Sequence, residues 1–575
     1  MKKYIVLLMT GLLLGCSTDF LELEDPNNLV ESNYPTSAAD IEQLLQGAYG
    51  TQHAFGLYGH TMLAKNLFCW DHTQDMAWLG TQTWINLAQN DTRASDPFLQ
   101  DTWNDSYKGV QRANTILEIV ERFRTEDAHG VTPEQLNTFE GQAHYLRAWF
   151  YFNLISIWGE TFIIDGQGRD GAGVPLITTV AGSNDETAIG RSSVGEVWDF
   201  IIGELKQAES LLENTSWSGA DIYKVNVWSI RAFLGKVYAF TDDWQSARTY
   251  LQDVVENSGK SLVPFQVYKD MFNGENEFNS ESLIEIPLTD DVGGNANTDL
   301  TTGSWIGMII APSWANDAGS PVGSGWSNAF PHRKNLRRFG YGLAHYFDAG
   351  VTEANANNVR AGYVDEANAV RENKSVDPRL WVAMLQPYVD FMTVGGIQRA
   401  ISHYHDGVEV QMDAWSFRKY VYLKNNQTSV RNFGANIYFL RLADVYLLYA
   451  EALIETGDPV LGLEFVNKVK RRAYDYPVDA PSPVDYASLT SQTMANDPVL
   501  QNDPLKYERF AELFGEGHKW FDTRRWQTGA AEAAYYESVR GGSINWEDTD
   551  YAQPIPTLEI ETNPAIEFAD QNPGY

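Results

Sequence analysis

Tryptophans and carboxylates are interleaved along one polar stretch of the chain. Trp70, Trp78 and Trp84 alternate with Asp71 and Asp75. A pyranose ring has a face rich in C–H groups that lies flat on an indole, and carboxylates then accept hydrogen bonds from the sugar hydroxyls. Because Trp78 and Trp84 are separated by an even number of residues, an extended chain places them on one side. These residue types predict a sugar-binding surface that includes Trp78, Trp84, Asp71 and Asp75.

A second group of tryptophans lies further along, at Trp305, Trp314 and Trp326, in sequence rich in Gly, Ser and Asn. Indoles in such loops are harder to bury than indoles on a periodic helix. We therefore add these three residues to the candidate ligand-binding set. For every tryptophan the competing interpretation is core packing, and for the two aspartates it is a solvated loop carboxylate.

Helical hairpins are the elements expected to position these loops. Residues 436–472 are predicted to form two antiparallel helices, broken at Gly457-Asp458-Pro459, with Leu440 and Leu447 on the apolar stripe of the first. One such pair cannot bury its apolar face alone, so neighbouring pairs must stack on it. Further helices are predicted at 38–52, 101–122, 134–158, 194–213, 226–256 (a pair) and 504–520.

Within the pair at 226–256, Gly235 and Ala247 are expected to let two helices approach closely. The alternative to a helical repeat is an ordinary irregular helical domain. Residues 262–433 differ in character, with weak helical periodicity and short strands predicted at 282–287 and 419–424. This part is predicted to be a subdomain of loops and short strands inserted between helical pairs.

The first residues are predicted to be a processing signal. Lys2 and Lys3 precede an apolar run at 4–15 that is too short to span a bilayer, and residues 13–16 resemble a bacterial lipoprotein cleavage box. We therefore expect residues 1–15 to be a signal peptide, Cys16 to carry lipid, and residues 16–37 to form an acidic tether. The alternative is a plain secretion signal with an incidental cysteine at position 16.

Composition excludes some classes of function. The formal net charge is −34 over 575 residues, and no basic run is long enough to form a nucleic-acid footprint. The same charge disfavours anionic ligands, although a local basic pocket could override it. Cys69, in an apolar context, is predicted to be a buried thiol rather than a nucleophile.

Two motifs that could hold a cofactor or a metal are not interpreted as sites. The GxGxxG at 166–171 is followed by Val174-Pro175 rather than by a helix, and His403 with His405 has no further ligand nearby in sequence. We expect no cofactor and no metal. Glu512, Glu516 and His518 are interpreted as structural.

Several segments, taken together, resemble one protein family. Residues 441–453 are similar to the signature helix of the SusD/RagB-like nutrient-binding outer-membrane lipoproteins of Bacteroidetes. Further similar segments follow the family order along the chain: 145–148, 158–159, 377–379, 467–473, 508–526, 554–556 and 571–575. The match covers nearly the whole chain.

The resemblance implies a mainly α fold: a scaffold of about four tetratricopeptide-like helix pairs plus an irregular subdomain that carries most of the ligand site. It divides the mature chain into scaffold at 38–261 (with a Trp-rich loop at 55–100), ligand-binding subdomain at 262–433, and scaffold with C-terminal tail at 434–575. It also implies a role without catalysis. Such proteins are anchored on the outside of the outer membrane by lipid alone, capture an oligosaccharide, and pass it to a SusC-like TonB-dependent barrel.

Two other functions stay open. RagB-like members bind a peptide, and a lipoprotein glycoside hydrolase would need only two acting carboxylates among 76 acidic residues. For the favoured function, acidity and clustered indoles point to a neutral glycan such as a β-glucan or a fructan.

Overall fold

The computed structural model of the chain describes residues 34–60, 86, 90–126, 130–289, 303–312, 331–342, 356–394, 397–401, 404–405, 408–409, 415–425, 433–540, 544 and 546–575. The longer helices are α2 (Ala38–Gly50), α5 (Pro97–Glu126), α6 (Pro133–Trp158), α7 (Val194–Leu211), α8 (Val227–Phe240), α9 (Trp244–Asn257), α13 (Ala356–Glu372), α15 (Leu442–Glu455), α16 (Pro459–Ala473), α17 (Pro504–Leu513) and α19 (Gly529–Arg540). The shorter ones are α10 (Phe265–Asp270), α11 (Ile306–Ile310), α12 (Arg333–Arg338), α14 (Leu380–Ala383), α18 (Lys519–Arg525) and α20 (Thr557–Thr562).

Six 3-10 helices and nine short strands complete the described elements. The 3-10 helices are η2 (Thr51–His53), η5 (Asn184–Thr187), η6 (Gly219–Asp221), η7 (Met271–Asn273), η8 (Asp548–Tyr551) and η9 (Phe568–Asp570). The strands are β1 (Ser282–Ile286), β2 (Met384–Leu385), β3 (Phe391–Val394), β4 (Ile397–Ala400), β5 (Tyr404–His405), β6 (Val408–Glu409), β7 (Ser416–Phe417), β8 (Lys424–Asn425) and β9 (Ile437–Arg441).

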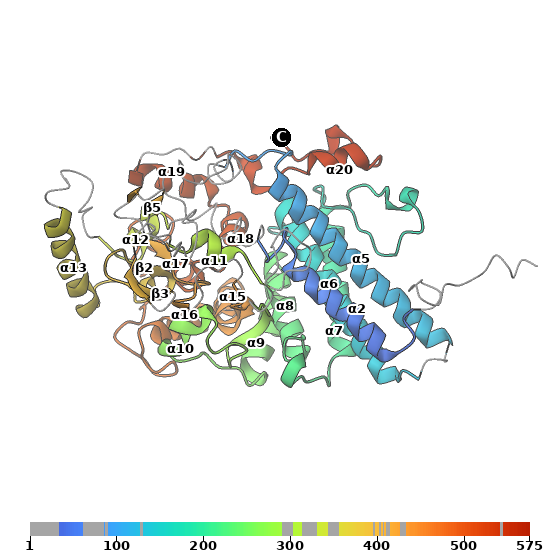
Figure 1. Ribbon diagram of the computed structural model, residues 1–575, viewed down its shortest axis with the longest axis horizontal. Coiled ribbons are helices and arrows are strands. Elements are labelled where there is room, and N and C mark those ends of the chain that lie inside the picture. Colours follow the sequence, from blue (N-terminus) through green and yellow to red (C-terminus); the bar gives the residue numbers. More distant parts are fainter. Residues whose placement is uncertain are drawn as a thin grey trace, which may run out of the picture.

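Consecutive long helices pack against one another to form the scaffold. α5 contacts α6, which contacts α7, and the series continues through α8 to α9. α9 then packs against α15, although residues 262–433 lie between them in sequence, and α15 contacts α16 and α17. Figure 1 shows this stack passing from α5 to the centre of the molecule, with the strands and short helices on the other side. The predicted mainly helical fold is confirmed.

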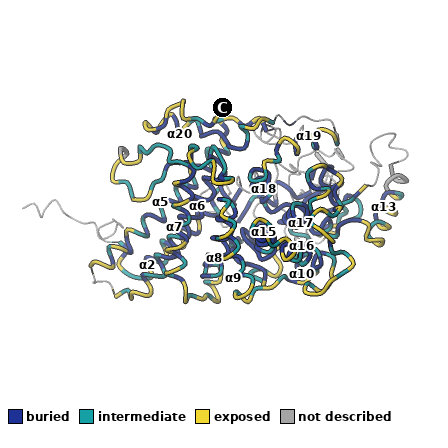
Figure 2. Tube along the Cα trace, turned by 180° about the vertical axis from the view of Figure 1, so that it is seen from behind, coloured by how far each residue is buried: buried dark blue, intermediate teal, exposed yellow. Residues whose placement is uncertain are grey.

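Burial follows this arrangement. α6 is buried along most of its length and forms the middle of the N-terminal helices, whereas α13 and α20 lie at the margins and carry exposed residues (Figure 2). Among the described residues, no helix combines the length and apolarity needed to cross a bilayer.

Three helix ends, at the start of α6, the end of α15 and the start of α16, occur where the local sequence predicts them. The hydroxyl of Thr132 accepts the N–H of Gln135, whose side chain accepts the N–H of Thr132, and Pro133 occupies the first turn of α6. Gly457 ends α15 with φ of +87°, a conformation that costs glycine nothing. Asp458 then caps α16.

Two glycines allow neighbouring helices to touch. A Cβ atom on Gly235 would lie 2.5 Å from the side chain of Leu251, and one on Gly109 would lie 2.2 Å from the ring of Phe150. α8 and α9, and α5 and α6, can therefore be this close only with glycine at these positions. The close approach predicted at Gly235 is confirmed.

The helix predicted to begin at residue 436 begins later, at Leu442. Residues 437–441 form β9 instead, antiparallel to β1, with Leu440 opposite Ile284 and Ile437 opposite Ile286. Both strands are buried along their whole length. The β-branched and aromatic side chains of β9 favour a strand, and pairing with β1, which is distant in sequence, stabilises the strand over the predicted helix.

Two further predictions from local pattern were wrong. Residues 419–423 form turns rather than a strand, with φ of +62° at Tyr420, whose N–H donates to the carbonyl of Phe272. The single helix predicted at 504–520 is split into α17 and α18. Gly515 and Gly517, with φ of +79° and +86°, make the break.

A buried cluster of charges joins the helices to the strands; we call it the Arg441 network. Its members are Asp377, Glu281, Glu508, Glu512, Glu516, Arg379, Arg441, Arg472 and Lys419, all buried. The Arg441 guanidinium donates to Glu281 (2.6 Å), to Glu512 (2.7 Å) and to both oxygens of Glu516 (2.7 Å each). Each carboxylate in the centre is thus neutralised by a fixed partner.

The same network holds residues from several segments. Arg472 donates to Glu281 at 2.9 Å and also to Glu512, and Lys419 donates to Glu516 at 2.6 Å. Glu512 and Glu516 are therefore buried and paired with arginines, as expected for structural residues, although one oxygen of Glu512 accepts no hydrogen bond and lies 3.7 Å from Arg379. His518 is buried beside Asp444, at 3.6 Å, in an adjoining cluster.

The close approach of α8 and α9 gives a first prediction. Gly235→Val should lower the free energy of unfolding by about 1–3 kcal/mol, because the added atoms overlap Leu251. The matched control is Gly203→Val on α7, where a Cβ meets nothing within 4 Å and the change in helix propensity from glycine to valine is the same. Urea titrations of both variants measure the difference, and equal losses would contradict the account.

The Arg441 network gives a second prediction, on acid stability. Burial alone would raise the pKa of Glu512, but Arg472 and Arg441 lower it to about 2. The folded protein therefore binds fewer protons here than the unfolded chain, and this contribution to stability is complete above about pH 4.5 and is lost as the pH falls toward 2. Glu512→Gln should lower the melting temperature at neutral pH, and its deficit should shrink between about pH 5 and pH 3.

The control is Glu561→Gln, at an exposed position on α20. Its melting temperature should follow that of the unsubstituted protein across the same range. A Glu512→Gln deficit that stays constant with pH would show that the carboxylate does not act through its charge.

Candidate functional site

The segment before residues 61–85 and the segment after residues 290–302 meet in the fold. The carbonyl of Gly59 accepts the N–H of Trp305 at 2.7 Å and the hydroxyl of Ser304 at 3.1 Å. Ser304 in turn exchanges two 2.9 Å backbone hydrogen bonds with Phe433, which follows residues 426–432. Three parts of the chain that are distant in sequence are thus fixed at one place.

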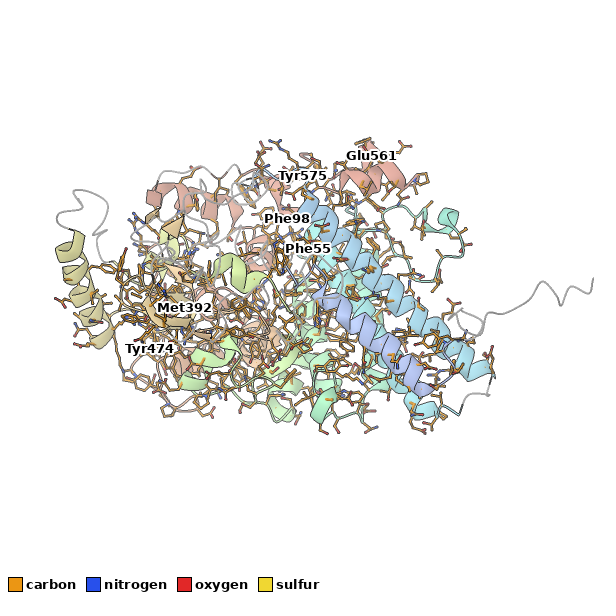
Figure 3. The ribbon with its side chains drawn as sticks, in the orientation of Figure 1. Phe55, Phe98, Met392, Tyr474, Glu561 and Tyr575 are labelled. Carbon is orange, nitrogen blue, oxygen red and sulfur yellow. The ribbon has the colours of Figure 1, made fainter. Side chains whose placement is uncertain are left out.

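Four aromatic side chains gather at this point; we call them the aromatic cluster. The Phe55 and His60 rings are stacked with centroids 4.3 Å apart, and the Trp305 ring meets Phe55 and His60 edge-on at 6.0 and 5.8 Å. Phe98 lies 5.5 Å from His60. His60 is buried, whereas Phe55, Phe98 and Trp305 are partly exposed. Figure 3 shows Phe55 and Phe98 close to the first turns of α5.

The backbone of Gly56, the residue after Phe55, is hydrogen-bonded to two polar side chains of α5. The N–H of Gly56 donates to Asp105 at 2.8 Å, and its carbonyl accepts the hydroxyl of Thr102 at 2.8 Å. A Cβ on Gly56 would lie 2.1 Å from the carbonyl oxygen of Asp101, so no other residue fits. Phe55 is therefore presented by a fixed backbone.

Trp305 is fixed from the other side. It precedes α11, and the hydroxyl of Ser304 accepts the N–H of Ile306 at 3.2 Å. A Cβ on Gly307 would lie 2.2 Å from the ring of Phe433, which shows how closely α11 lies on that residue. The backbone that carries the indole is therefore held on both sides of Trp305.

The electrostatics of the site favour an uncharged ligand. Burial lowers the pKa of His60 to about 4, so this ring is neutral at pH 7. Burial, together with the negative charges of Asp105 and Asp96, raises the pKa of Asp101 to about 6. The carboxylates of these aspartates can accept hydrogen bonds from the hydroxyl groups of a ligand, whereas an anionic ligand would be repelled by their negative charge.

Of the residues predicted from the sequence, Trp305 is brought into the aromatic cluster. Trp78, Trp84, Trp314, Trp326, Asp71, Asp75, Cys16 and Cys69 lie outside the described residues. Sequence reasoning missed Phe55, His60 and Phe98. The available signal was the pair Gly56 and Gly59, flanked by Phe55 and His60, in a segment without helical periodicity.

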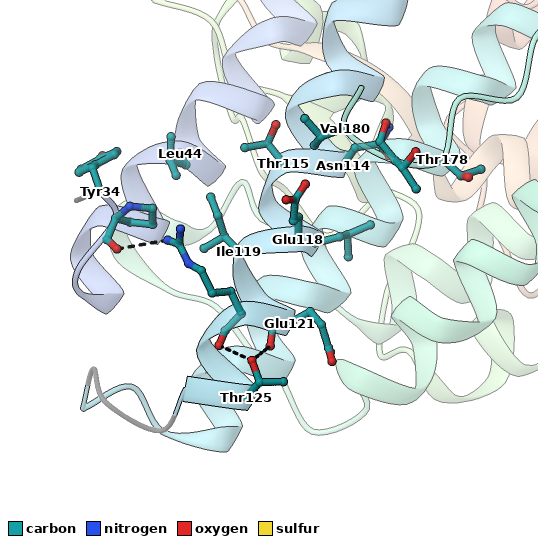
Figure 4. A pocket seen from close by; sticks show the side chains of 14 residues that line it. Tyr34, Leu44, Asn114, Thr115, Glu118, Ile119, Glu121, Thr125, Thr178 and Val180 are labelled. Atoms are coloured by element: carbon teal, nitrogen blue, oxygen red, sulfur yellow. Dashed lines mark hydrogen bonds between the residues drawn. The ribbon is translucent and has the colours of Figure 1, made fainter. Parts of the chain in front are cut away.

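A cavity of about 880 Å³ lies elsewhere, between α2, α5 and residues 178–180. Figure 4 shows its side chains, among them Leu44, Ile119 and Val180. Tyr34 is the one aromatic among its described lining residues, and the amide of Asn114 is already engaged by the carbonyls of Ile177 and Thr179. This cavity offers a ring no aromatic platform comparable with the cluster.

Comparison with known proteins agrees with this architecture. The model of the SusD family matches residues 281–575, and a family described as starch-binding and associating with the outer membrane matches residues 19–239. A SusD-like protein of Formosa agariphila is 23% identical over the whole of both chains.

Solved structures show the same fold. A SusD-like protein of Bacteroides fragilis superposes with a TM-score of 0.67 at 19% identity, covering 94% of this chain and 98% of the other. A laminarin-binding SusD-like protein superposes with a TM-score of 0.63 at 22% identity, covering 93% of this chain and 99% of the other. On its fold, on the arrangement of its helices and strands, and on the family match over residues 281–575, this chain belongs to the SusD family.

Proposed function

We propose that this chain is a surface lipoprotein that binds a glycan without cleaving it and passes it to a SusC-like TonB-dependent transporter. The observation that carries the proposal is the aromatic cluster, whose partly exposed rings are held by both the helical scaffold and the strand-bearing part of the chain. Rigid aromatic rings supply contact area at little entropic cost, which suits binding rather than chemistry. Membership of the SusD family supports the same role.

The ligand we propose is a neutral glycan, a β-glucan or a fructan. The acidic residues on α5 beside the cluster support a neutral ligand, and a solved neighbour in the family is named for binding laminarin, a β-glucan. We propose that Trp78, Trp84, Trp314 and Trp326 extend the surface. Asp71 and Asp75 would accept hydrogen bonds from the sugar hydroxyls.

Attachment to the outside of the outer membrane is proposed to depend on lipid at Cys16. Multiple acyl chains anchor a protein stably where one chain does not. The family description that mentions association with the outer membrane covers residues 19–239 and supports this location.

Removal of one ring from the cluster should weaken glycan binding. Trp305→Ala and Phe55→Ala are each expected to reduce affinity for laminarin about five- to tenfold, since a stacked ring contributes about 1–1.4 kcal/mol. Affinity electrophoresis against laminarin, inulin and a panel of other polysaccharides measures the effect. Phe568→Ala, at a residue 70% exposed on η9, is the control and should be retained like the unsubstituted protein.

Melting temperatures of the same variants separate lost binding from lost folding. Retention of Trp305→Ala and Phe55→Ala equal to that of the control would contradict a site at the cluster. Binding to a peptide pool but to no glycan would favour the RagB-like alternative. Release of reducing ends from a polysaccharide would favour a glycoside hydrolase.

Cys16→Ser should release the protein from the membrane fraction of cells that express the full chain. Without the thiol, no lipid can be attached at this position. Detergent phase partitioning with Triton X-114 measures the change, and unaltered partitioning would contradict lipidation at Cys16.

A further inference from the structure

A second pocket lies where the end of α16 meets α10 and the segment between α13 and α14. Its volume is about 330 Å³, and Phe265, Val376 and Pro378 contribute apolar walls. Tyr474, which follows α16, also lines it. In Figure 3 Tyr474 lies well apart from Phe55 and Phe98, so this pocket is separate from the aromatic cluster.

One wall of the pocket is a fixed indole. Trp381 contacts the guanidinium of Arg371, 4.2 Å from its ring centroid, and the ring of Trp415, stacked at 5.9 Å. Arg371 is itself held by both oxygens of Asp390, at 2.8 Å each, and by Gln386 at 3.0 Å. These contacts hold the indole in place at the wall of the pocket.

Two lysines line the pocket without a salt bridge to any described residue. Within the described part of the chain, the ammonium groups of Lys269 and Lys374 make no hydrogen bond and no ion pair, although both residues line this pocket. Burial lowers the pKa of Lys269, and the nearby positive charge of Arg418 lowers it further. The carboxylates of Asp270 and Asp390 act in the opposite direction and offset part of this lowering.

This feature is unusual for the chain. Lysines are favoured near helix C-termini, which accounts for Lys269 on α10 and Lys374 just after α13. It does not account for their shared pocket, nor for the absence of an ion pair in a chain with 76 acidic and 42 basic residues. Lys269 and Lys374 thus line a compact, partly apolar pocket without a hydrogen-bond acceptor for their ammonium groups among the described residues.

We propose that this pocket binds a single sugar unit that carries a carboxylate or a sulfate ester. The anionic group is received by Lys269 and Lys374, the ring lies along Phe265 and Trp381, and Asp475 accepts hydrogen bonds from hydroxyls at the rim. A pocket of this volume accommodates one ring rather than an extended chain. The inference goes beyond the proposed function, because it concerns another surface and a charged sugar.

The test is calorimetric titration of the purified protein with D-glucuronate and with D-glucose 6-sulfate, against D-glucose as the neutral probe. At least one anionic sugar should bind about tenfold more tightly than glucose, and raising NaCl from about 50 to about 300 mM should weaken that binding. Lys269→Gln combined with Lys374→Gln should abolish the preference. Lys206→Gln, at an exposed lysine on α7, should leave it unchanged.

Equal affinity for all three sugars, or a preference that survives the double substitution, would overturn the proposal. Lys374→Gln alone, at an exposed position, guards against a folding defect and should give an intermediate loss. Trp305→Ala should leave anionic-sugar binding intact. Failure here is therefore distinguishable from failure of the neutral-glycan proposal, which the polysaccharide gels report.

Discussion

The buried carboxylates around Arg441 constrain where every neighbouring segment of this fold can lie. Glu281 comes from the residue before β1, Arg441 from the junction of β9 and α15, Arg472 from α16 and Glu512 from α17. A buried charge is very costly unless all its partners are in place, and loss of one partner costs about 3–5 kcal/mol. The four segments must therefore arrive together, which fixes the strands on the helices.

The candidate binding surface follows from that constraint through a short series of contacts. From β9 the chain runs back to Asn436, whose side chain donates to Glu285 and accepts the N–H of Leu288, so that β1 and β9 stay in register beyond their last pair. Three residues earlier, Phe433 pairs with Ser304, and Ser304 in turn contacts Gly59. The aromatic cluster is thus built from both sides of the molecule.

This arrangement leaves partly exposed aromatic rings at the candidate site, beside acidic residues of α5. Glu512 and Glu516, two carboxylates of the Arg441 network, are buried and neutralised by arginines. The partly exposed groups at the cluster are flat rings on clamped backbone. Contact area without covalent chemistry suits the reversible glycan binding that we propose.

Helix positions could be predicted from the sequence because their signals are local. The cap at Thr132, the break at Gly457 and the glycine contact at Gly235 each depend on residues within a few turns. β9 could not be predicted, because its partner β1 lies more than a hundred residues away and the same residues also fit a helical stripe.

The candidate site could be predicted from the sequence only in part, for the same reason. Trp305 could be proposed from its loop composition, but Phe55 and Phe98 resemble core residues until the fold brings them beside it. The Gly59 and Ser304 contact that joins them spans 245 residues, and no spacing rule reports a contact of that kind.

The most direct test of the account is hydrogen–deuterium exchange of the protein with and without laminarin, or with whichever glycan the gels identify. The account predicts slower exchange on binding at residues 54–60 and 303–312 together, because both lie at the aromatic cluster. Protection confined to other segments, such as the α2 and α5 groove, with no change at 54–60 or 303–312, would contradict it.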